Sequence, residues 1–260
     1  MEPSERGVAV VGDDRAAAIR DALAGLPYRS VERDAADAVV AVGDDALRDA
    51  LAGAPDAPVI PVGSRRLAVD PDDAERRFRA LLDAALLDED DGDPLPDRGE
   101  RRDGVRRVAH PVLAVDAGDG RTRRAAFDVA LVTVEPARIS EFAIGFVGGA
   151  DEAFRADGVV VATPLGSDGY ADAVGGPVVE PGGGLSVAPI APFRTRTDTW
   201  IAADRLSVSV ERETESVALV VDGEERAVVA PHRSIAIEAV DAVTLVTLAS
   251  AERARRSERL

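Results

Sequence analysis

The stretch from residue 157 to residue 181, DGVVVATPLGSDGYADAVGGPVVEP, constrains the fold of this chain more than any other. Residues 158–163 are apolar and mostly β-branched, which is typical of a buried strand. Pro164 ends the strand because it has no N–H to donate to a neighbour. The glycines that follow let a ligand lie against the main chain, and Ser167 and Asp168 add a hydroxyl and a carboxylate. The stretch predicts a small-molecule site at the end of a strand, although a tight turn between two core elements would use similar residues.

The composition excludes several kinds of chemistry. All 31 basic residues are arginine, and the chain has neither lysine nor cysteine. Without lysine there is no Walker-A lysine, no protein-kinase strand lysine and no Schiff base. Without cysteine there is no thiolate nucleophile, disulfide, iron–sulfur cluster or thiolate zinc site. P-loop kinases and thiolate enzymes are therefore excluded.

The net charge of −17 limits the partners of the chain. Nucleic acid requires clustered basic groups, and the arginines here are interspersed with carboxylates. A lysine-free acidic surface stays soluble where salt screens charge strongly, which is typical of a halophilic archaeon or another salt-loving microbe, and codon bias would give the same trend. No apolar run approaches the ~20 residues of a membrane span, and the first residues lack a signal-peptide pattern. We expect a cytoplasmic protein that binds neither nucleic acid nor membrane.

The two histidines, His110 and His232, each stand beside a proline and lie far apart in the sequence. Such isolated histidines are more often core or solvent-edge residues than metal ligands. We therefore predict no metal site built by protein side chains.

Residues 1–87 alternate between short apolar runs and amphipathic segments. The predicted strands occupy residues 7–11, 29–32, 38–42 and 59–62. The predicted helices occupy residues 14–23, 46–52 and 70–87, with Asp14 as the expected N-cap of the first. Strands that alternate with helices indicate a parallel α/β domain.

The rest of the chain has a different pattern. Residues 88–103 are charged and poor in apolar side chains, so they predict a linker or an exposed loop. Residues 104–248 predict a β-rich domain with few helices, and residues 249–260 a frayed C-terminal tail. Turn residues at 116–120 and 222–223 predict hairpins. The predicted strands occupy residues 105–115, 125–134, 139–147, 158–163, 186–190, 200–210, 217–221, 227–229, 234–239 and 244–248.

The central stretch resembles the TPTGSTAY…GGP signature of the NAD kinase family. The resemblance is carried by Thr163-Pro164-Leu165-Gly166-Ser167-Asp168-Gly169-Tyr170, by Gly175-Gly176-Pro177 and by the preceding Asp157-Gly158. Asp168 and Gly169 stand where the family has Thr-Ala. The likeness covers roughly residues 38–248 and implies a two-domain fold, α/β first and β-rich second, with the ligand cleft between the two domains.

The family's GGDG motif follows a strand, and the matching residues here are Val42-Gly43-Asp44-Asp45. Asp44 keeps the carboxylate of the motif, while Val42 and Asp45 replace glycines. The resemblance implies that Asp44 orients or deprotonates the hydroxyl that receives the phosphoryl group, with Gly43 and Asp45 beside the ligand. A carboxylate here is also a common helix N-cap, and the two roles are compatible.

The resemblance further implies which residues contact the dinucleotide. The family's Asn-Glu pair corresponds to Asp128 and Val129; an ionised Asp128 accepts hydrogen bonds but donates none, and Val129 does neither. The other implied contacts are Asp157, Thr163, Gly166, Ser167, Asp168, Gly169 and Tyr170.

NAD kinases transfer a phosphoryl group from ATP, or in some members from polyphosphate, to the 2′-hydroxyl of the adenosine ribose of NAD. The resemblance implies NAD, ATP and Mg²⁺ as cofactors and a homo-oligomer, either a dimer or a tetramer. Two alternatives remain open. Because Val42, Asp45, Asp128 and Val129 depart from the family together, the chain could bind NAD(P)(H) as a regulatory protein without turnover. It could also be a related kinase that acts on another hydroxyl, such as that of a different nucleoside or a lipid head group.

Overall fold

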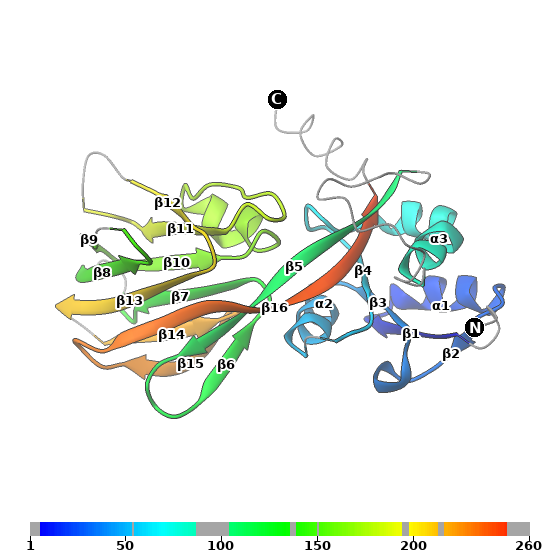
Figure 1. The fold of residues 1–260 in the computed structure, drawn as a ribbon, viewed down its shortest axis with the longest axis horizontal. Helices are drawn as coiled ribbons and strands as arrows, with labels where there is room; N and C mark the ends of the chain where they lie inside the picture. Colours follow the sequence, from blue (N-terminus) through cyan, green and yellow to red (C-terminus); the bar gives the residue numbers. More distant parts are fainter. Residues whose placement is uncertain are drawn as a thin grey trace. The chain divides into compact units, whose positions relative to one another are not determined.

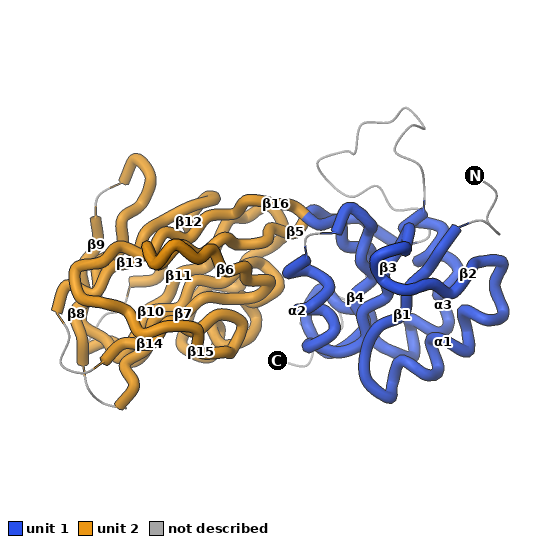
Figure 2. The backbone as a smooth tube through the Cα atoms, turned by 90° about the horizontal axis from the view of Figure 1, so that it is seen from below, with its two compact units in different colours: residues 1–109, 243–260 blue, residues 110–242 orange. Residues whose placement is uncertain are grey.

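The structure is a computed structural model, and it describes residues 6–53, 55–86, 104–135, 139–149, 151–193, 198–212 and 216–248. The chain divides into two compact units, residues 1–109 with 243–260 and residues 110–242 (Figure 2). The predicted linker at 88–103 and the predicted tail at 249–260 lie outside the described residues.

Two long strands run from one unit into the other, β5 (Val105–Asp116) and β16 (Ser234–Leu248). Residues 104–109 and 243–248, which the sequence pattern grouped with the β-rich domain, therefore belong to the first unit. The end of β16 joins the first unit through its parallel pairing of Leu245 with Val59. The apolar pattern of a strand does not reveal which neighbour it pairs with.

The first unit is a parallel α/β layer with strand order β2-β1-β3-β4. Its strands are β1 (Gly7–Gly12), β2 (Arg29–Ser30), β3 (Ala38–Val42) and β4 (Val59–Val62). Its helices are α1 (Ala16–Ala24), α2 (Asp44–Ala52) and α3 (Pro71–Ala85), with a short 3₁₀ turn, η2 (Arg33–Ala35). The parallel α/β prediction for this part of the chain is confirmed.

Helices cover the sheet of the first unit because β3 is buried along its whole length and needs apolar cover on both faces. Helices α1 and α3 pack on one face, where Ile19 and Leu23 meet Phe78 and Leu81 in a single core cluster (Figure 1). Helix α2 contacts β1, β3 and β4 outside this cluster. The predicted apolar face of α3 is confirmed, since Leu82 and Ala85 are also buried.

Helices α1 and α3 begin in different ways: the N-cap side chain of α3 makes a capping hydrogen bond, and that of α1 makes none. Asp70 caps α3 by accepting a hydrogen bond from the Asp72 main-chain N–H at 3.0 Å, with Pro71 in the first helical position. The predicted cap of α1 by Asp14 is wrong, because the cap residue is Arg15 and its side chain makes no capping bond. The Asp13 carboxylate accepts a hydrogen bond from the Arg15 N–H at 3.0 Å. The side chain that bonds to the main chain before α1 is therefore that of Asp13.

The second unit is a β-sandwich. One sheet has the order β12-β11-β10-β7-β14-β15, and the other joins β16, β13, β8 and β9, with β5 and β6 beside β16 (Figure 1). Apolar side chains from both sheets, including Leu131 and Val159 on one and Phe142 and Val208 on the other, form a single buried core. The remaining bounds are β6 (Thr122–Ala125), β7 (Asp128–Thr133), β8 (Ser140–Phe146), β9 (Glu152–Ala156), β10 (Gly158–Ala162), β11 (Leu185–Ile190), β12 (Trp200–Ala202), β13 (Arg205–Arg212), β14 (Val217–Val221) and β15 (Glu224–Val229).

Several predicted strands of this unit are divided differently in the structure. The run at 125–134 breaks between β6 and β7, and the run at 200–210 breaks between β12 and β13, which lie in different sheets. The runs at 234–239 and 244–248 form the single strand β16. Strand β9 was missed because its sequence EAFRA has no β-branched residue.

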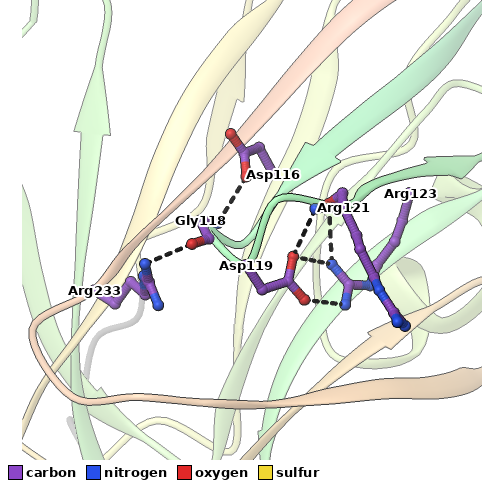
Figure 3. Close-up of polar contacts among 6 residues, drawn as sticks. All are labelled: Asp116, Gly118, Asp119, Arg121, Arg123 and Arg233. Carbon is purple, nitrogen blue, oxygen red and sulfur yellow. Dashed lines mark hydrogen bonds and ion pairs between the residues drawn. The ribbon is translucent and has the colours of Figure 1, made fainter.

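Both predicted hairpins are confirmed, and polar side chains close the first of them (Figure 3). The Asp116 carboxylate accepts the Gly118 N–H at 2.7 Å, and Arg233 donates to the Gly118 carbonyl at 2.5 Å. Asp119 accepts from the Arg123 guanidinium at 2.6 Å, and this hydrogen bond is the main reason why the pKa of Asp119 falls to about 2. The β5–β6 turn therefore keeps its charged network at any pH well above 2.

The Tyr28 hydroxyl gives a test of the packing of α3 against the first strands. It donates to the Asp83 carboxylate at 2.6 Å, and burial together with Asp83 raises the pKa of Tyr28 to about 12. Because the folded-state pKa lies above the unfolded value near 10, this contribution to stability is complete below pH 10 and is lost between about 10 and 12. Tyr28→Phe should lower the free energy of unfolding by about 0.5–1 kcal/mol at neutral pH.

Phenolate absorbance against pH checks the raised pKa of Tyr28, because the chain has only two tyrosines. Removing Tyr28 should abolish the transition near pH 12, while Tyr170→Phe should retain it. A Tyr28→Phe titration with that transition intact would show that the Asp83 contact is absent in solution.

Candidate functional site

The carboxyl ends of three adjacent parallel strands form the floor of a crevice in the first unit. Strands β1, β3 and β4 end at or next to Gly12, Gly43 and Gly63, whose φ angles are +142°, +90° and +156°. A cavity of about 850 Å³ opens over these strand ends. Successive strands are added on one side of β1 and then on the other, so β1 and β3 meet at a topological switch point. Ligands of open α/β sheets bind at such points.

Gly12 is required because the ends of β1 and β3 approach one another closely. A Cβ on Gly12 would lie 2.3 Å from the Val42 carbonyl oxygen. The Gly43 N–H donates to the Val62 carbonyl at 2.9 Å, so that the main chain of β3 and β4 stays paired up to the crevice. The floor of the crevice is therefore main chain without side chains, which leaves room for a ligand.

Asp44 lies at the rim of this crevice, as the first residue of α2. Its carboxylate lies 3.2 Å from the Arg65 Nε, and the two side chains are 48% and 19% exposed. The N-cap of α2 is Gly43, so the interpretation of Asp44 as a helix N-cap is wrong. Asp45 also lines the crevice, and its highly exposed carboxylate pairs with Arg48 at 3.1 Å on the surface of the helix.

A second aspartate–arginine pair, Asp13 with Arg15, also lines the crevice, and the sequence analysis missed it. Arg15 donates to both carboxylate oxygens of Asp13, at 2.7 Å for the shortest bond, and this pairing lowers the pKa of Asp13. The Arg15 Nη2 lies 3.1 Å from where a Cβ on Gly43 would stand. The hydrogen bond to Asp13, with a weaker attraction by Asp44, raises the pKa of Arg15. The GDDR sequence that contains this pair was interpreted only as the start of a helix.

The glycine-lined loop of the second unit begins at Thr163, directly after β10. The Thr163 side chain is fully buried and its hydroxyl donates to the carbonyls of Ala126 and Phe127, at 2.9 and 3.1 Å. The Ser167 hydroxyl is also fully buried; it donates to the Pro164 carbonyl at 2.8 Å and accepts from the Val179 N–H at 3.0 Å. Both hydroxyls hold the loop to the rest of the unit.

Gly166 is needed for packing rather than for an unusual backbone angle. Its φ is −85°, which any residue adopts. A Cβ at this position would, however, lie 2.1 Å from the Phe127 carbonyl oxygen. The loop therefore rests directly on the main chain between β6 and β7.

The accessible residues of the loop are 168–170, in the middle of the short π-helical turn η3 (Ser167–Ala171). Asp168 and Gly169 are half-buried, and Tyr170 is 44% exposed. Burial, followed by the charges of Asp128 and Asp157, raises the pKa of Tyr170. The structure thus brings these two predicted carboxylates into electrostatic range of the predicted tyrosine.

The two carboxylates near Tyr170 stand at opposite ends of the β7–β10 pair. Asp128 begins β7 and pairs with Ala162, and Asp157 immediately precedes Gly158, which pairs with Val132. Both aspartates are half-buried. Val129, next to Asp128, is fully buried in the core of the sandwich, because successive residues of a strand point to opposite faces.

Each unit therefore groups its own share of the predicted site residues. Gly43, Asp44 and Asp45 line the crevice of the first unit. The loop from Thr163 to Tyr170, with Asp128 and Asp157, lies in the second unit. Among the described residues, no three acidic or histidine side chains stand close enough together to bind a metal ion. His110 is buried, with its Nε2 3.1 Å from the Ala126 carbonyl oxygen, whereas His232 is exposed.

Comparison with known proteins shows what the second half of the chain is similar to. Residues 128–247 match the sequence model of the ATP-NAD kinase C-terminal domain. An NAD kinase of Methanospirillum hungatei is 38% identical over 96 residues, and one of Thermococcus kodakarensis is 34% identical over 123 residues. These alignments cover 36% and 46% of this chain, and only 36% and 44% of the length of the two relatives.

Solved structures extend the likeness to the whole fold. An NAD kinase from Archaeoglobus fulgidus in complex with ATP superposes with a TM-score of 0.72 at 23% identity, over 97% of each chain. A yeast NADH kinase complexed with NADH gives the same TM-score at 16% identity, over 98% of this chain and 87% of its own. The α/β unit and the β-sandwich thus define a protein with the two-domain NAD kinase fold. In sequence, residues 128–247 are similar to the C-terminal domain of ATP-NAD kinases.

None of the helices in the part of the chain that the structure describes is long and apolar enough to cross a lipid bilayer.

The close contact at Gly166 predicts a large effect of a small substitution. Gly166→Ala should lower the free energy of unfolding by about 3 kcal/mol, because the added methyl group meets a carbonyl that is itself held by Thr163. Gly25→Ala is a matched control, since its φ of −84° is similar and the nearest atom to an added Cβ is 3.6 Å away. Denaturant unfolding followed by circular dichroism measures both variants. Equal effects of the two substitutions would contradict the contact between the loop and Phe127.

Proposed function

We propose that this protein is an NAD kinase that transfers the γ-phosphoryl group of ATP to the 2′-hydroxyl of the adenosine ribose of NAD, forming NADP and ADP. The observation that carries the proposal is the glycine-floored crevice with Asp44 at its rim, in a chain whose residues 128–247 match the ATP-NAD kinase C-terminal domain. The relatives that match are named NAD kinases, and two structural neighbours hold ATP and NADH.

Asp44 is the proposed catalytic carboxylate. In the reaction the 2′-hydroxyl oxygen forms a bond to the γ-phosphorus, the bond from that phosphorus to the β–γ bridging oxygen breaks, and ADP leaves. The hydroxyl proton passes to the Asp44 carboxylate, which acts as general base. The Arg65 Nε lies 3.2 Å from that carboxylate and forms an ion pair with it. Asp44 is accessible enough to meet a hydroxyl, because nearly half of its side-chain surface is exposed.

The phosphates of the donor require positive charge and N–H donors in a chain that has no lysine. Arg15 supplies a guanidinium beside Gly43, and the start of α2 supplies main-chain N–H groups that have no partner within the helix. Mg²⁺ would enter this site as part of the nucleotide complex and would need at most one or two carboxylates of the crevice. The ion would supply positive charge that offsets the charge of the phosphates.

The loop of the second unit is the proposed dinucleotide site. Thr163, Gly166 and Ser167 shape the loop from inside, because their side chains or Cα atoms face buried main chain. The groups left to contact the dinucleotide are Asp128, Asp157, Asp168, the Gly169 main chain and Tyr170. The carboxylates suit the hydroxyl and amino donors of a nucleoside, and the Tyr170 ring suits stacking on a base.

Three further features remain predictions about the protein in the cell. They are a dimer or tetramer of identical chains, a cytoplasmic location and a halophilic archaeal source. The acidic, lysine-free composition supports the last of these, and the assays below are therefore run at high salt.

Formation of NADP from NAD, ATP and Mg²⁺, measured in high salt beside an active NAD kinase, tests the proposed function. NADP should appear in proportion to enzyme and time. Saturable NAD binding without product would instead identify a non-catalytic NAD-binding protein, and phosphorylation of a different nucleoside or of a lipid head group would identify another acceptor.

Removing the charge of Asp44 should reduce turnover sharply. We expect Asp44→Asn to lower kcat by about 10²-fold or more, because an amide cannot accept the hydroxyl proton. Asp73→Asn is the matched control: Asp73 also lies in the first turn of a helix, pairs with an arginine and is 42% exposed. A near-normal kcat for Asp44→Asn would exclude Asp44 as the base.

Asp45→Gly restores the residue that the family has at this position. The carboxylate of Asp45 is 88% exposed and lines the crevice, so its removal takes a negative charge away from the path of the phosphates. We expect kcat/KM for ATP to stay equal or to rise, measured from initial rates at varied ATP. A clear fall in kcat/KM would show that Asp45 helps to bind the nucleotide–metal complex.

A further inference from the structure

The side chain of Asp222 leaves its own hairpin and binds a different part of the second unit. Asp222 and Gly223 form the turn between β14 and β15, where Asp222 has a φ of +49°. Its carboxylate accepts three main-chain hydrogen bonds, from Ala126 at 2.8 Å, Phe127 at 2.7 Å and Asp128 at 3.0 Å. A two-residue turn needs no such carboxylate, so these contacts point to a role beyond the hairpin.

The three N–H groups belong to the turn between β6 and β7, and the carbonyls of the same turn hold the glycine-lined loop. The Ala126 carbonyl accepts from the Thr163 hydroxyl at 2.9 Å. The Phe127 carbonyl accepts from the Thr163 N–H at 2.9 Å and from its hydroxyl at 3.1 Å. The turn is thus bound by a charged acceptor on one side and by the first residue of the loop on the other.

These hydrogen bonds support one another. A carboxylate that accepts from a peptide N–H polarises the peptide group and strengthens its carbonyl as an acceptor, in particular where water is excluded. Thr163 is fully buried, and a Cβ on Gly166 would collide with the Phe127 carbonyl oxygen. The position of that carbonyl therefore sets the position of the loop at both Thr163 and Gly166.

Asp222 also controls Asp128 directly. The Asp128 N–H donates to the Asp222 carboxylate, and the Asp128 carbonyl accepts from the Asp222 N–H at 2.9 Å. Asp128 is one of the two carboxylates whose charge reaches Tyr170. The main chain of Asp128 is therefore attached directly to the Asp222 side chain, and the base of the loop is attached to it through the turn between β6 and β7.

We propose that Asp222 is a positioning residue for the dinucleotide loop, which sets the affinity for NAD without contacting NAD. The inference rests on the proposed function, because it takes the loop from Thr163 to Tyr170 as the dinucleotide site. Donor binding and the proton transfer depend on Arg15 and Asp44, which belong to the other unit. The effect of Asp222 is therefore specific to the dinucleotide.

The test uses Asp222→Asn in the full chain. Asparagine keeps the shape and tolerates a positive φ, but it has one acceptor oxygen for three N–H groups and turns an amide toward one of them. We expect KM for NAD, and Kd for NAD from calorimetry, to rise about 10-fold or more. KM for ATP and kcat at saturating NAD should change by less than about 3-fold, and Asp222→Glu, which keeps the charge, should recover part of the NAD affinity.

Asp37→Asn is the matched control. The Asp37 carboxylate accepts the Gly7 N–H at 2.6 Å and its own N–H donates to the Gly7 carbonyl at 2.8 Å, so it makes the same kind of reciprocal contact in the first unit. This variant should leave Kd for NAD unchanged. A normal Kd for NAD in Asp222→Asn, or an equal rise in KM for both substrates, would overturn the proposal.

Two further measurements keep the proposal testable if Asp222→Asn does not fold. Thr163→Val removes the hydroxyl on the other side of the same turn, so it should weaken NAD binding in the same selective way; unchanged NAD affinity in this variant would contradict the proposal. Calorimetry with NAD also separates this inference from the proposed function. A wild-type chain that binds NAD but makes no NADP would refute the kinase activity and still allow the effect of Asp222 on NAD affinity to be measured.

Discussion

In the second unit, the position of the glycine-lined loop depends on the hydrogen bonds of the turn between β6 and β7. Its peptide groups lie where the strand pairing is interrupted, and main-chain groups without a partner are costly in such a place. The Asp222 carboxylate satisfies the N–H side of the turn, and Thr163 satisfies the carbonyl side. Because both partners come from distant parts of the sequence, the turn joins the β14–β15 hairpin to the end of β10. The glycine-lined loop takes its position from this junction, and Gly166 is small because the junction leaves no room for a side chain.

The first unit meets a similar requirement with a different device. Three parallel strands end side by side, and the glycines at their ends leave main chain exposed to the crevice. Around this neutral floor the charges are arranged as aspartate–arginine pairs, Asp13 with Arg15 and Asp44 with Arg65. Each carboxylate forms an ion pair with its guanidinium, and the Arg15 side chain lines the crevice. A chain without lysine thereby supplies positive charge at the site from side chains that are already held in place.

The departures from the family motifs have distinct structural consequences. Val129 lies in the core of the sandwich, so the side chain at this position contributes packing and cannot reach a ligand on the outer face. Asp128 faces the other way and stays half-buried near Tyr170. Asp45 points along the surface of α2 toward Arg48, so its charge is partly offset within the helix. Of these changes, the one at Asp45 bears most directly on phosphates entering the crevice.

The sequence by itself determined the parallel α/β pattern of the first unit, the β-rich pattern of the second and the loop that begins at Thr163. These features depend on local periodicity, on the rigid ring of Pro164 and on glycines, which act within a few residues of themselves. Only the tertiary structure decided which strands pair, where β16 continues from one unit into the other, and that Asp222 holds the Ala126–Asp128 turn. It likewise decided that Arg15 and Arg65 stand beside Gly43 and Asp44, and that the hydroxyls of Thr163 and Ser167 face inward. Contacts between residues that are tens of positions apart depend on how the main chain folds in space, which a local pattern of side chains does not predict.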